Sequence, residues 1–228
     1  MAVIEYALDE NVAIVTMNNG ENRFNFDFFE AFNKVLDEIE NETKANVLVL
    51  KSADEKIFSN GIDLDWLMPA VQKGGPEVGK KFGLGLNSLF KRILTYPMIT
   101  IAAINGHAFA GGAIMTCAFD FRFMRTQRGF FCFPEVDINI PFTPFLIALT
   151  KKAIPMYKNI EMKLTGKRLT AEECEEHHII VKACHIDDLM SEVLAFAKGF
   201  NKDRKMLKAM KEGLYADAIQ VFEEEYGK

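Results

Sequence analysis

The sequence has few of the residues on which disulfide-stapled, metal-binding or nucleic-acid-binding proteins depend. It holds four cysteines and four histidines in 228 residues, and the cysteines have neither a CxxC spacing nor a metal-like grouping with histidine. The net charge is −5 and no basic block occurs, which argues against a nucleic-acid partner. We therefore expect reduced thiols in an intracellular protein and no metal site.

A long uninterrupted apolar run is also missing. The segment PMITIAAINGHAFAGGAIMTCAF has no acidic residue, lysine or arginine, but Asn105-Gly106-His107 divides it into a β-branched half and a small-residue half. This pattern favours a strand, a turn and a helix over a membrane span, which needs about 20 apolar residues. Neither a signal peptide nor a C-terminal targeting signal is recognisable, so we expect a cytoplasmic protein without a membrane partner.

The composition that is present, 49% hydrophobic and 26% charged, is typical of a globular protein. The first two-thirds alternate between strand and helix patterns, and from about Thr143 onward helical patterns dominate. The predicted fold class is therefore α/β, with a C-terminal helical region. Gly74-Gly75-Pro76 is expected to form a mobile loop. Strands are predicted at 3–8, 11–17, 46–50, 98–104, 121–124 and 130–133, and early helices at 25–41, 79–96 and 113–119.

FSNGIDLDWL, which begins at Phe58, is the first of three unusual stretches. It leaves the end of a buried strand, where α/β proteins place ligands. Gly61 permits a tight turn from which the N–H of Ile62 can point outward, and Asp63 can cap the next helix. An ordinary strand-to-helix turn is the alternative.

The second stretch, NGHAFAGGAI, also joins a buried strand to a helix. Gly111 and Gly112 would lie at a helix N-terminus, where free N–H groups attract a negative oxygen. Close packing of the helix against its strand would explain the same glycines. Phosphate binding is a weaker interpretation because neither GxGxxG nor GK[ST] is present. His107 has no partner pattern for nucleophilic catalysis and is expected to be a buried, hydrogen-bonded histidine.

The third stretch, GFFCFPEVDINI, places Glu135 in an apolar run. Such a carboxylate is either exposed at a strand end or a buried acid with a raised pKa. Asp137 follows two residues later, so a carboxylate pair is also an open alternative.

Together these stretches resemble the crotonase superfamily, also called the enoyl-CoA hydratase/isomerase family. FSNGIDL, PMITIAAINGHAFAGG, FCFPEVDINI and TGKRLTAEECEEHHIIVKA follow that family's order and spacing across roughly positions 1–185. The resemblance implies a crotonase-like ββα spiral core over 1–185 and a C-terminal helical region over 186–228 that covers the site and builds trimers. It also implies an acyl-CoA substrate, no separate cofactor because CoA is part of the substrate, and a homotrimer or dimer of trimers.

The resemblance further implies the site residues. In the family, two backbone N–H groups form an oxyanion hole for the thioester oxygen, and the matching residues are Ile62 and Gly111. CoA contacts from Arg23 and Lys56 are guesses. Phe142 and Phe145 come from a segment that lacks the family's glycine pair and could line the acyl pocket. The full set of other substrate-binding positions is Ser59, Asn60, Gly61, Asp63, Leu64, Gly112, Phe142 and Phe145.

One departure from the family indicates the reaction. Hydratases of the family carry two glutamates at the site. The first lies three residues after the oxyanion glycine, where this sequence has Ile114, and the second is present here as Glu135. This pattern resembles single-glutamate Δ3,Δ2-enoyl-CoA isomerases, the plant type in particular, in which one acid/base moves a proton between C2 and C4. The alternatives are a thioester hydrolase or other crotonase-fold enzyme, a weak enoyl-CoA hydratase, and a non-catalytic acyl-CoA-binding protein.

Overall fold

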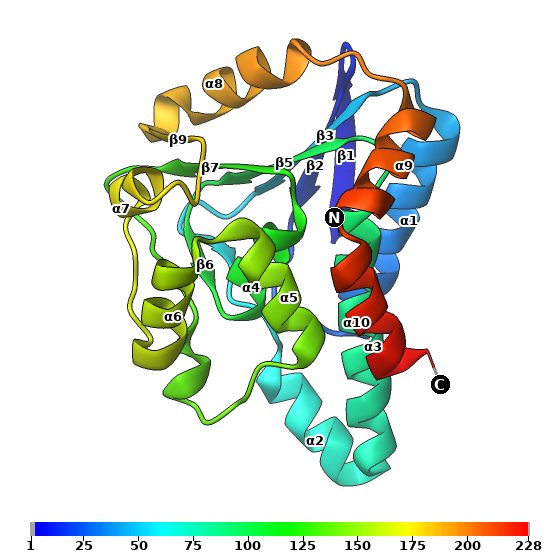
Figure 1. The fold of residues 1–228 in the computed structure, drawn as a ribbon, viewed down its shortest axis with the longest axis vertical. Coiled ribbons are helices and arrows are strands. Elements are labelled where there is room, and N and C mark those ends of the chain that lie inside the picture. The colour runs from blue at the N-terminus through cyan, green and yellow to red at the C-terminus, as the bar shows by residue number, and fades with distance from the viewer. Residues whose placement is uncertain (1–2, 228) are drawn as a thin grey trace.

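Two parallel β-sheets organise the chain in the computed structural model, which describes residues 3–227 (Figure 1). The larger sheet has the order β1-β2-β3-β5-β7-β9, and only its β1–β2 hairpin is antiparallel. The smaller sheet has the order β4-β6-β8. The strands are β1 (Ile4–Asp9), β2 (Val12–Met17), β3 (Val47–Ser52), β4 (Ile57–Ser59), β5 (Ile99–Ile104), β6 (His107–Phe109), β7 (Phe121–Arg125), β8 (Phe131–Cys132) and β9 (Lys182–Cys184).

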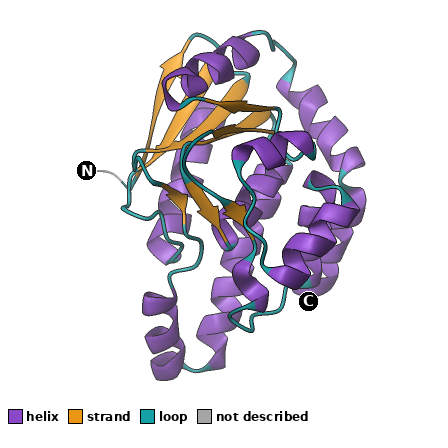
Figure 2. Ribbon diagram, turned by 90° about the vertical axis from the view of Figure 1, so that its left-hand side faces the viewer, coloured by secondary structure: helices purple, strands orange, loops and turns teal. Residues whose placement is uncertain are grey.

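Helices cover both faces of the larger sheet (Figure 2). The helix α8 lies on one face, and α1, α3 and α4 lie on the other side (Figure 1). The alternation of side chains along β3 explains the two cores, because Val47 and Val49 join the α8 cluster whereas Leu48 and Leu50 join the main cluster. The helices are α1 (Phe26–Glu42), α2 (Leu64–Gly74), α3 (Pro76–Leu94), α4 (Gly111–Ala118), α5 (Pro144–Ala153), α6 (Met156–Thr165), α7 (Ala171–Glu176), α8 (Ile186–Lys198), α9 (Arg204–Leu214) and α10 (Ala216–Tyr226), with a 3₁₀ turn at Pro134–Val136.

A strand–strand–helix unit repeats along the first two-thirds of the chain. A long strand of the larger sheet is followed by a short strand of the smaller sheet and then by a helix, in the series β3-β4-α2, β5-β6-α4 and β7-β8 with the 3₁₀ turn and α5. The predicted α/β fold with a ββα spiral core is thereby confirmed. Because β4 and β6 are parallel neighbours, the segments that follow them emerge at the same edge.

Two local predictions were wrong. Gly74-Gly75-Pro76 is a one-residue junction and not a loop, because α2 ends at Gly74 and α3 begins at Pro76. Gly75 adopts φ 78, which favours glycine, and proline is well suited to the first turn of a helix. The short strands β4, β6 and β9 were also not predicted, since three residues each carry too little pattern.

The C-terminal region packs against both cores. Leu189 and Val193 of α8 belong to the cluster on the outer sheet face, and Phe222 of α10 belongs to the main cluster. Lys211 of α9 is buried, forms an ion pair with Asp120 at 2.6 Å and donates to the carbonyl oxygen of Met98 at 2.7 Å. The helices after position 185 therefore complete the hydrophobic core. The division of the chain at 185/186 stays a prediction, and Lys228 lies outside the described residues.

Asp63 caps α2, as the sequence predicts. Its Oδ1 accepts the backbone N–H of Trp66 at 3.1 Å. We expect Asp63→Ala to lower the free energy of unfolding by about 1 kcal/mol, because an N–H at the helix start loses its acceptor. Urea denaturation measures this loss. Asp63→Asn keeps the acceptor oxygen and serves as the control, so equal losses in the two variants would refute the capping role.

Candidate active site

The two glycine-containing loops meet at the ends of β4 and β6. A Cβ on Gly61 would lie 2.6 Å from the backbone nitrogen of Gly111, and one on Gly112 would lie 2.3 Å from the carbonyl oxygen of Ser59. Gly61 also has φ +76, a conformation that favours glycine. Close backbone packing therefore explains part of the glycine pattern, and it brings two loops that are about 50 positions apart in the chain into one site.

Two backbone N–H groups at this junction are free to bind a ligand. Neither the N–H of Ile62 nor that of Gly111 has a hydrogen-bond acceptor within residues 3–227, and both residues line the same cavity. Gly111 is the first residue of α4, so its N–H carries the partial positive charge of a helix N-terminus. The pair can therefore stabilise a negative oxygen, as the family resemblance implied.

Ala110 holds the N-terminus of α4 in an unusual conformation. Its φ of 49° and ψ of −127° fall in a region that glycine favours. The backbone N–H of Ala110 donates to the carbonyl oxygen of Cys132 at 3.1 Å, which fixes the strained residue against β8. Strain of this kind persists only where the surroundings impose it, and here it sets the direction of the next N–H, that of Gly111. Nothing in the local sequence indicated it.

The cavity has a volume of about 230 Å³ and mostly apolar walls. Six of the predicted residues line it: Asn60, Ile62, Leu64, Gly111, Glu135 and Phe142. Sequence reasoning missed the other ten lining residues, which come from α3, from β6 and the start of α4, and from the chain on both sides of Glu135. They are Leu86, Phe90, Phe109, Ala110, Ile114, Pro134, Ile138, Ile140, Pro141 and Leu146. The space suits an apolar chain with one polar end.

Four predicted residues lie directly behind this lining. The hydroxyl of Ser59 donates to the carbonyl oxygen of Asn22 at 2.8 Å and accepts the N–H of Gly61 at 3.1 Å. Gly61 and Gly112 provide the close backbone approach, and Asp63 caps α2. These residues shape the loops, and their predicted contact with a substrate stays a prediction.

The prediction that Phe145 lines the pocket is wrong. Its ring is fully buried in the main core, 5.3 Å from the ring of Phe222 of α10. Pro144 begins α5, and the helical rotation of about 100° per residue turns Leu146 toward the cavity instead of Phe145. No residue of 186–227 lines the cavity, and α10 packs behind its wall against both α5 and α3.

Glu135 is a buried acid, which decides between the two sequence-based alternatives. Its side chain follows β8 on the 3₁₀ turn, the residue is 7% exposed, and Oε2 has no hydrogen-bond partner within residues 3–227. Burial raises the pKa of Glu135 to about 7, and the Lys163 ammonium partly opposes this shift. Asp137 is exposed and lies beside Gly166, so it forms no carboxylate pair with Glu135. Glu135 is the one ionisable side chain of the described cavity wall.

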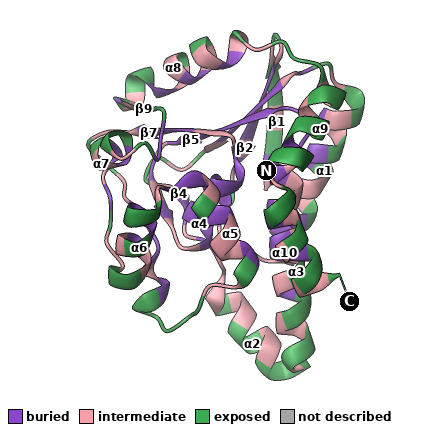
Figure 3. Ribbon diagram, viewed as in Figure 1, coloured by how far each residue is buried: buried purple, intermediate pink, exposed green. Residues whose placement is uncertain are grey.

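Two cations, the partly buried Lys152 and the buried Arg122, hold the opposite end of α4. The ammonium of Lys152 donates to the carbonyl oxygens of Cys117 at 3.2 Å and Phe119 at 2.7 Å. The guanidinium of Arg122 donates to the carbonyl oxygens of Thr116 and Phe119. All eight residues of α4 are buried near the centre of the molecule (Figure 3). The cations stabilise the negative end of the helix dipole and fix the helix whose first N–H faces the cavity.

The remaining candidates have other surroundings. Nδ1 of His107 accepts the N–H of Phe130 at 3.2 Å, so this histidine is hydrogen-bonded but only partly buried. Arg23 forms ion pairs with Glu21 at 2.7 Å and Asp65 at 2.8 Å. A CoA phosphate would have to compete with these carboxylates for Arg23. The contact of Lys56 with CoA stays a guess.

Within residues 3–227 no helix is both long and apolar enough to cross a membrane. In the same part of the chain no group of three or more histidine, cysteine, aspartate or glutamate residues is placed to hold a metal ion.

Known proteins share this fold. Residues 7–226 match the family model described as enoyl-CoA hydratase/isomerase. The chain is 31% identical to the peroxisomal enoyl-CoA delta isomerase 2 of Arabidopsis thaliana over 169 residues, which are 73% of this chain and 70% of that protein. It is 28% identical to a short-chain-enoyl-CoA hydratase of Clostridium acetobutylicum over 184 residues, 79% of this chain and 68% of that protein. A solved structure of a protein of the same family from Pseudomonas syringae matches with a TM-score of 0.88 at 23% identity, covering 97% of this chain and 94% of that one.

Proposed function

The chain belongs to the enoyl-CoA hydratase/isomerase family, and we propose that it is a Δ3,Δ2-enoyl-CoA isomerase. One observation carries the choice of reaction. Glu135 is the one ionisable side chain of an apolar cavity whose described wall also contains the free N–H groups of Ile62 and Gly111, and Ile114 stands where hydratases have the first of their two glutamates. A single acid/base suits migration of a double bond, whereas hydration has to hold and activate a water.

The proposed reaction moves one proton. The thioester oxygen accepts hydrogen bonds from the N–H groups of Ile62 and Gly111. The Glu135 carboxylate takes a proton from C2 of a 3-enoyl-CoA, and the electron pair of the broken C–H bond spreads into the dienolate. The same carboxyl group then returns the proton to C4, which leaves the double bond at C2. No electrons are lost and no cofactor is required. One fixed oxyanion donor lowers such a barrier by about 3–4 kcal/mol.

A paired assay tests the reaction. Purified protein is offered trans-3-hexenoyl-CoA and crotonyl-CoA, and the conjugated 2-enoyl thioester is followed by its ultraviolet absorbance. We expect the conjugated product to form from the first substrate, and the second to remain unchanged. Faster loss of crotonyl-CoA than conversion of the 3-enoyl substrate would refute the isomerase assignment in favour of a hydratase.

Asn60 supports a second candidate function, in which a water takes part in the reaction. Its Oδ1 is buried at the cavity without a hydrogen-bond partner within residues 3–227, while its backbone N–H donates to the carbonyl oxygen of Glu21 at 3.1 Å. A water held between this oxygen and Glu135 would allow hydration or thioester hydrolysis. The similarity to a hydratase agrees with the first of these reactions. Release of free CoA thiol in the paired assay would identify the hydrolase.

The pH dependence follows from the state of Glu135. The carboxylate must be ionised to take the C2 proton, and burial raises its pKa to about 7. We therefore expect kcat/KM for trans-3-hexenoyl-CoA to be low at pH 5, to rise with pH and to reach half its plateau near pH 7. A profile that is flat between pH 5 and 8 would contradict an essential base with this pKa.

The assembly and the location are part of the same proposal. The family resemblance favours a homotrimer or a dimer of trimers, which light scattering of the purified protein measures. The cytoplasm is the proposed location, and the peroxisomal name of the Arabidopsis relative is the specific alternative. Microscopy of a tagged protein in its own cells distinguishes the two compartments.

A further inference from the structure

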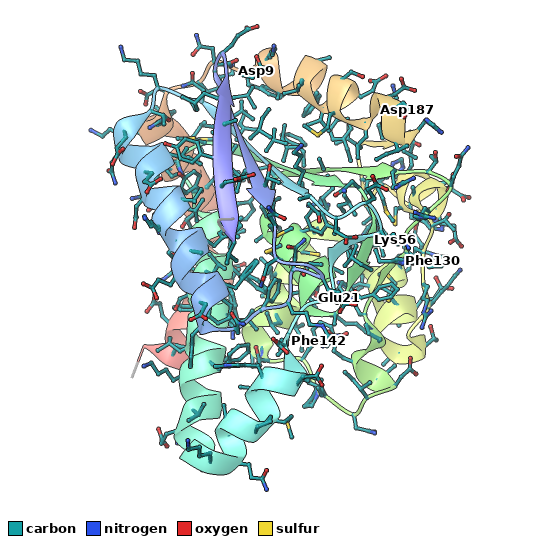
Figure 4. All side chains as sticks on the ribbon, turned by 180° about the vertical axis from the view of Figure 1, so that it is seen from behind. Asp9, Glu21, Lys56, Phe130, Phe142 and Asp187 are labelled. Atoms are coloured by element: carbon teal, nitrogen blue, oxygen red, sulfur yellow. The ribbon has the colours of Figure 1, made fainter. Side chains whose placement is uncertain are left out.

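A second cavity, of about 350 Å³, lies beside the acyl cavity. It is formed mainly by residues 125–130 and the start of α7. Phe130, one of its lining residues, is labelled beside Lys56 in Figure 4. His107 and Phe109 of β6 belong to different cavities, although their ring centroids are 5.0 Å apart. No described residue lines both cavities. The lining consists of His107, Arg125, Gln127, Arg128, Gly129, Phe130, Thr170, Ala171 and Glu172.

Positive charge exceeds negative charge in the lining of this second cavity. Arg125 and Arg128 line it, and the guanidinium of Arg168 lies 5.4 Å from the Phe109 ring centroid. None of these three arginines forms an ion pair with a carboxylate in the described part of the chain, although Arg23 and Arg92 each pair with two. The chain has 32 acidic and 27 basic residues, so carboxylates are not scarce. Two guanidinium groups without an ion pair line this cavity and a third acts on His107, and together they produce a local field that attracts anions.

His107 adds a hydrogen-bond donor to this field. Because its Nδ1 accepts the N–H of Phe130 at 3.2 Å, the neutral ring carries its hydrogen on Nε2. Burial lowers the pKa of His107, and Arg168 and Arg128 lower it further. The charges of Arg168 and Arg128 therefore act on the His107 ring, which lines the second cavity.

The framework of the cavity is fixed before any ligand binds. Nη1 of Arg125 donates to the carbonyl oxygens of Glu55 at 2.9 Å and Asn105 at 3.4 Å. Gly129 has φ +98, and a Cβ there would lie 2.8 Å from the carbonyl carbon of Gly106, so residues 125–130 pack closely on the turn between β5 and β6. A fixed framework reduces the ordering cost of binding.

We propose that this second cavity binds the phosphate group of a small molecule. A phosphate dianion matches several guanidinium groups better than a monovalent carboxylate does, because arginine presents a fork of donors to its oxygens. The neutral His107 ring supplies a further N–H donor. Glu172 is the one carboxylate of the described lining, so it disfavours a second negative group at that end of the cavity. The phosphate can come from inorganic phosphate, a nucleoside monophosphate or coenzyme A, and the experiment separates these sources.

The test is a titration with inorganic phosphate, followed through the ring signals of His107 in histidine NMR spectra. His107 is one of four histidines, so assignment is simple. We expect a saturable shift in the unmodified protein and at least about tenfold weaker binding in Arg128→Gln/Arg168→Gln. The side chains of Arg128 and Arg168 make no hydrogen bond within residues 3–227 and both are exposed, so this variant should fold. Lys34→Gln/Lys80→Gln removes the same charge from exposed helical positions, and its affinity should match the unmodified protein.

Adenosine monophosphate and coenzyme A form the other two arms. A His107 shift by coenzyme A that is lost in Arg128→Gln/Arg168→Gln would identify the CoA phosphates as the source. A shift by adenosine monophosphate that persists when coenzyme A saturates the protein would show a separate ligand. Absence of a saturable shift with all three compounds, or equal affinity in the arginine and lysine variants, would overturn the proposal. Because these readouts are binding constants, they stand apart from the outcome of the isomerase assay.

Discussion

Glu135→Gln should reduce kcat for trans-3-hexenoyl-CoA by about a thousandfold or more, with little change in substrate affinity. A one-base reaction loses both of its proton transfers when the carboxyl group becomes an amide, and each transfer depends on a positioned acid/base. The substitution keeps the size of the side chain in its apolar setting. Asp137→Asn is the matched control, because it removes an exposed carboxylate two residues away and should leave kcat unchanged. Near-normal turnover by Glu135→Gln would exclude Glu135 as the base.

The same variant should be more stable than the unmodified protein above neutral pH. The pKa of Glu135 is about 7 in the folded protein, against an ordinary value of 4.5. Between these pH values the folded state holds a proton that the unfolded state has released, so the free energy of unfolding falls as pH rises. The glutamine variant escapes this loss, which amounts to about 3 kcal/mol once pH exceeds 7 and vanishes below 4.5.

Urea denaturation of both proteins at pH 5 and pH 8 measures the effect. The expected sign is a widening stability gap in favour of Glu135→Gln as pH rises. A constant gap would mean that Glu135 has an ordinary pKa and is not the buried base described above. Together, lost turnover and increased stability would show that the ionised Glu135 carboxylate destabilises the fold but is required for the reaction.

The sequence predicted those parts of the site that depend on local backbone chemistry. Gly61 and Gly111 were identifiable because glycines at the junction of a buried strand and a helix have few explanations. Asp63 was identifiable as a helix cap, and Glu135 stood out because a carboxylate in a run of phenylalanines is unusual. Each of these signals lies within about ten residues of chain, the range over which sequence patterns are informative.

The parts that could not be predicted depend on contacts between distant segments. Whether Phe145 or Leu146 faces the cavity is set by the rotation of α5 relative to the sheet, and both residues are apolar. Leu86 and Phe90 belong to an amphipathic helix whose apolar face was recognisable, but its partner surface was not. Lys152 was an ordinary lysine in the sequence, and only the fold brings it to the end of α4.

Gly61→Ala is expected to abolish most of the proposed turnover of trans-3-hexenoyl-CoA without touching Glu135. The added methyl group would lie 2.6 Å from the nitrogen of Gly111 and 3.0 Å from its Cα, a contact that no ordinary carbon atom tolerates. The loop therefore has to move, and the distance between the Ile62 and Gly111 donors changes with it. Because loss of one oxyanion donor costs about 10²–10³ in kcat, we expect at least this reduction.

Backbone strain must be separated from this steric effect, and Gly75→Ala provides the comparison. Gly75 has φ +78, almost the same as the φ +76 of Gly61, but a Cβ there has nothing within 4 Å. Both variants should lose about 1–3 kcal/mol of stability, because alanine is strained at a positive φ. Only Gly61→Ala should lose turnover in addition, because only its methyl group displaces the N–H of Gly111. Equal activity of the two variants would contradict the proposal that the close contact between Gly61 and Gly111 positions the donors for the enolate.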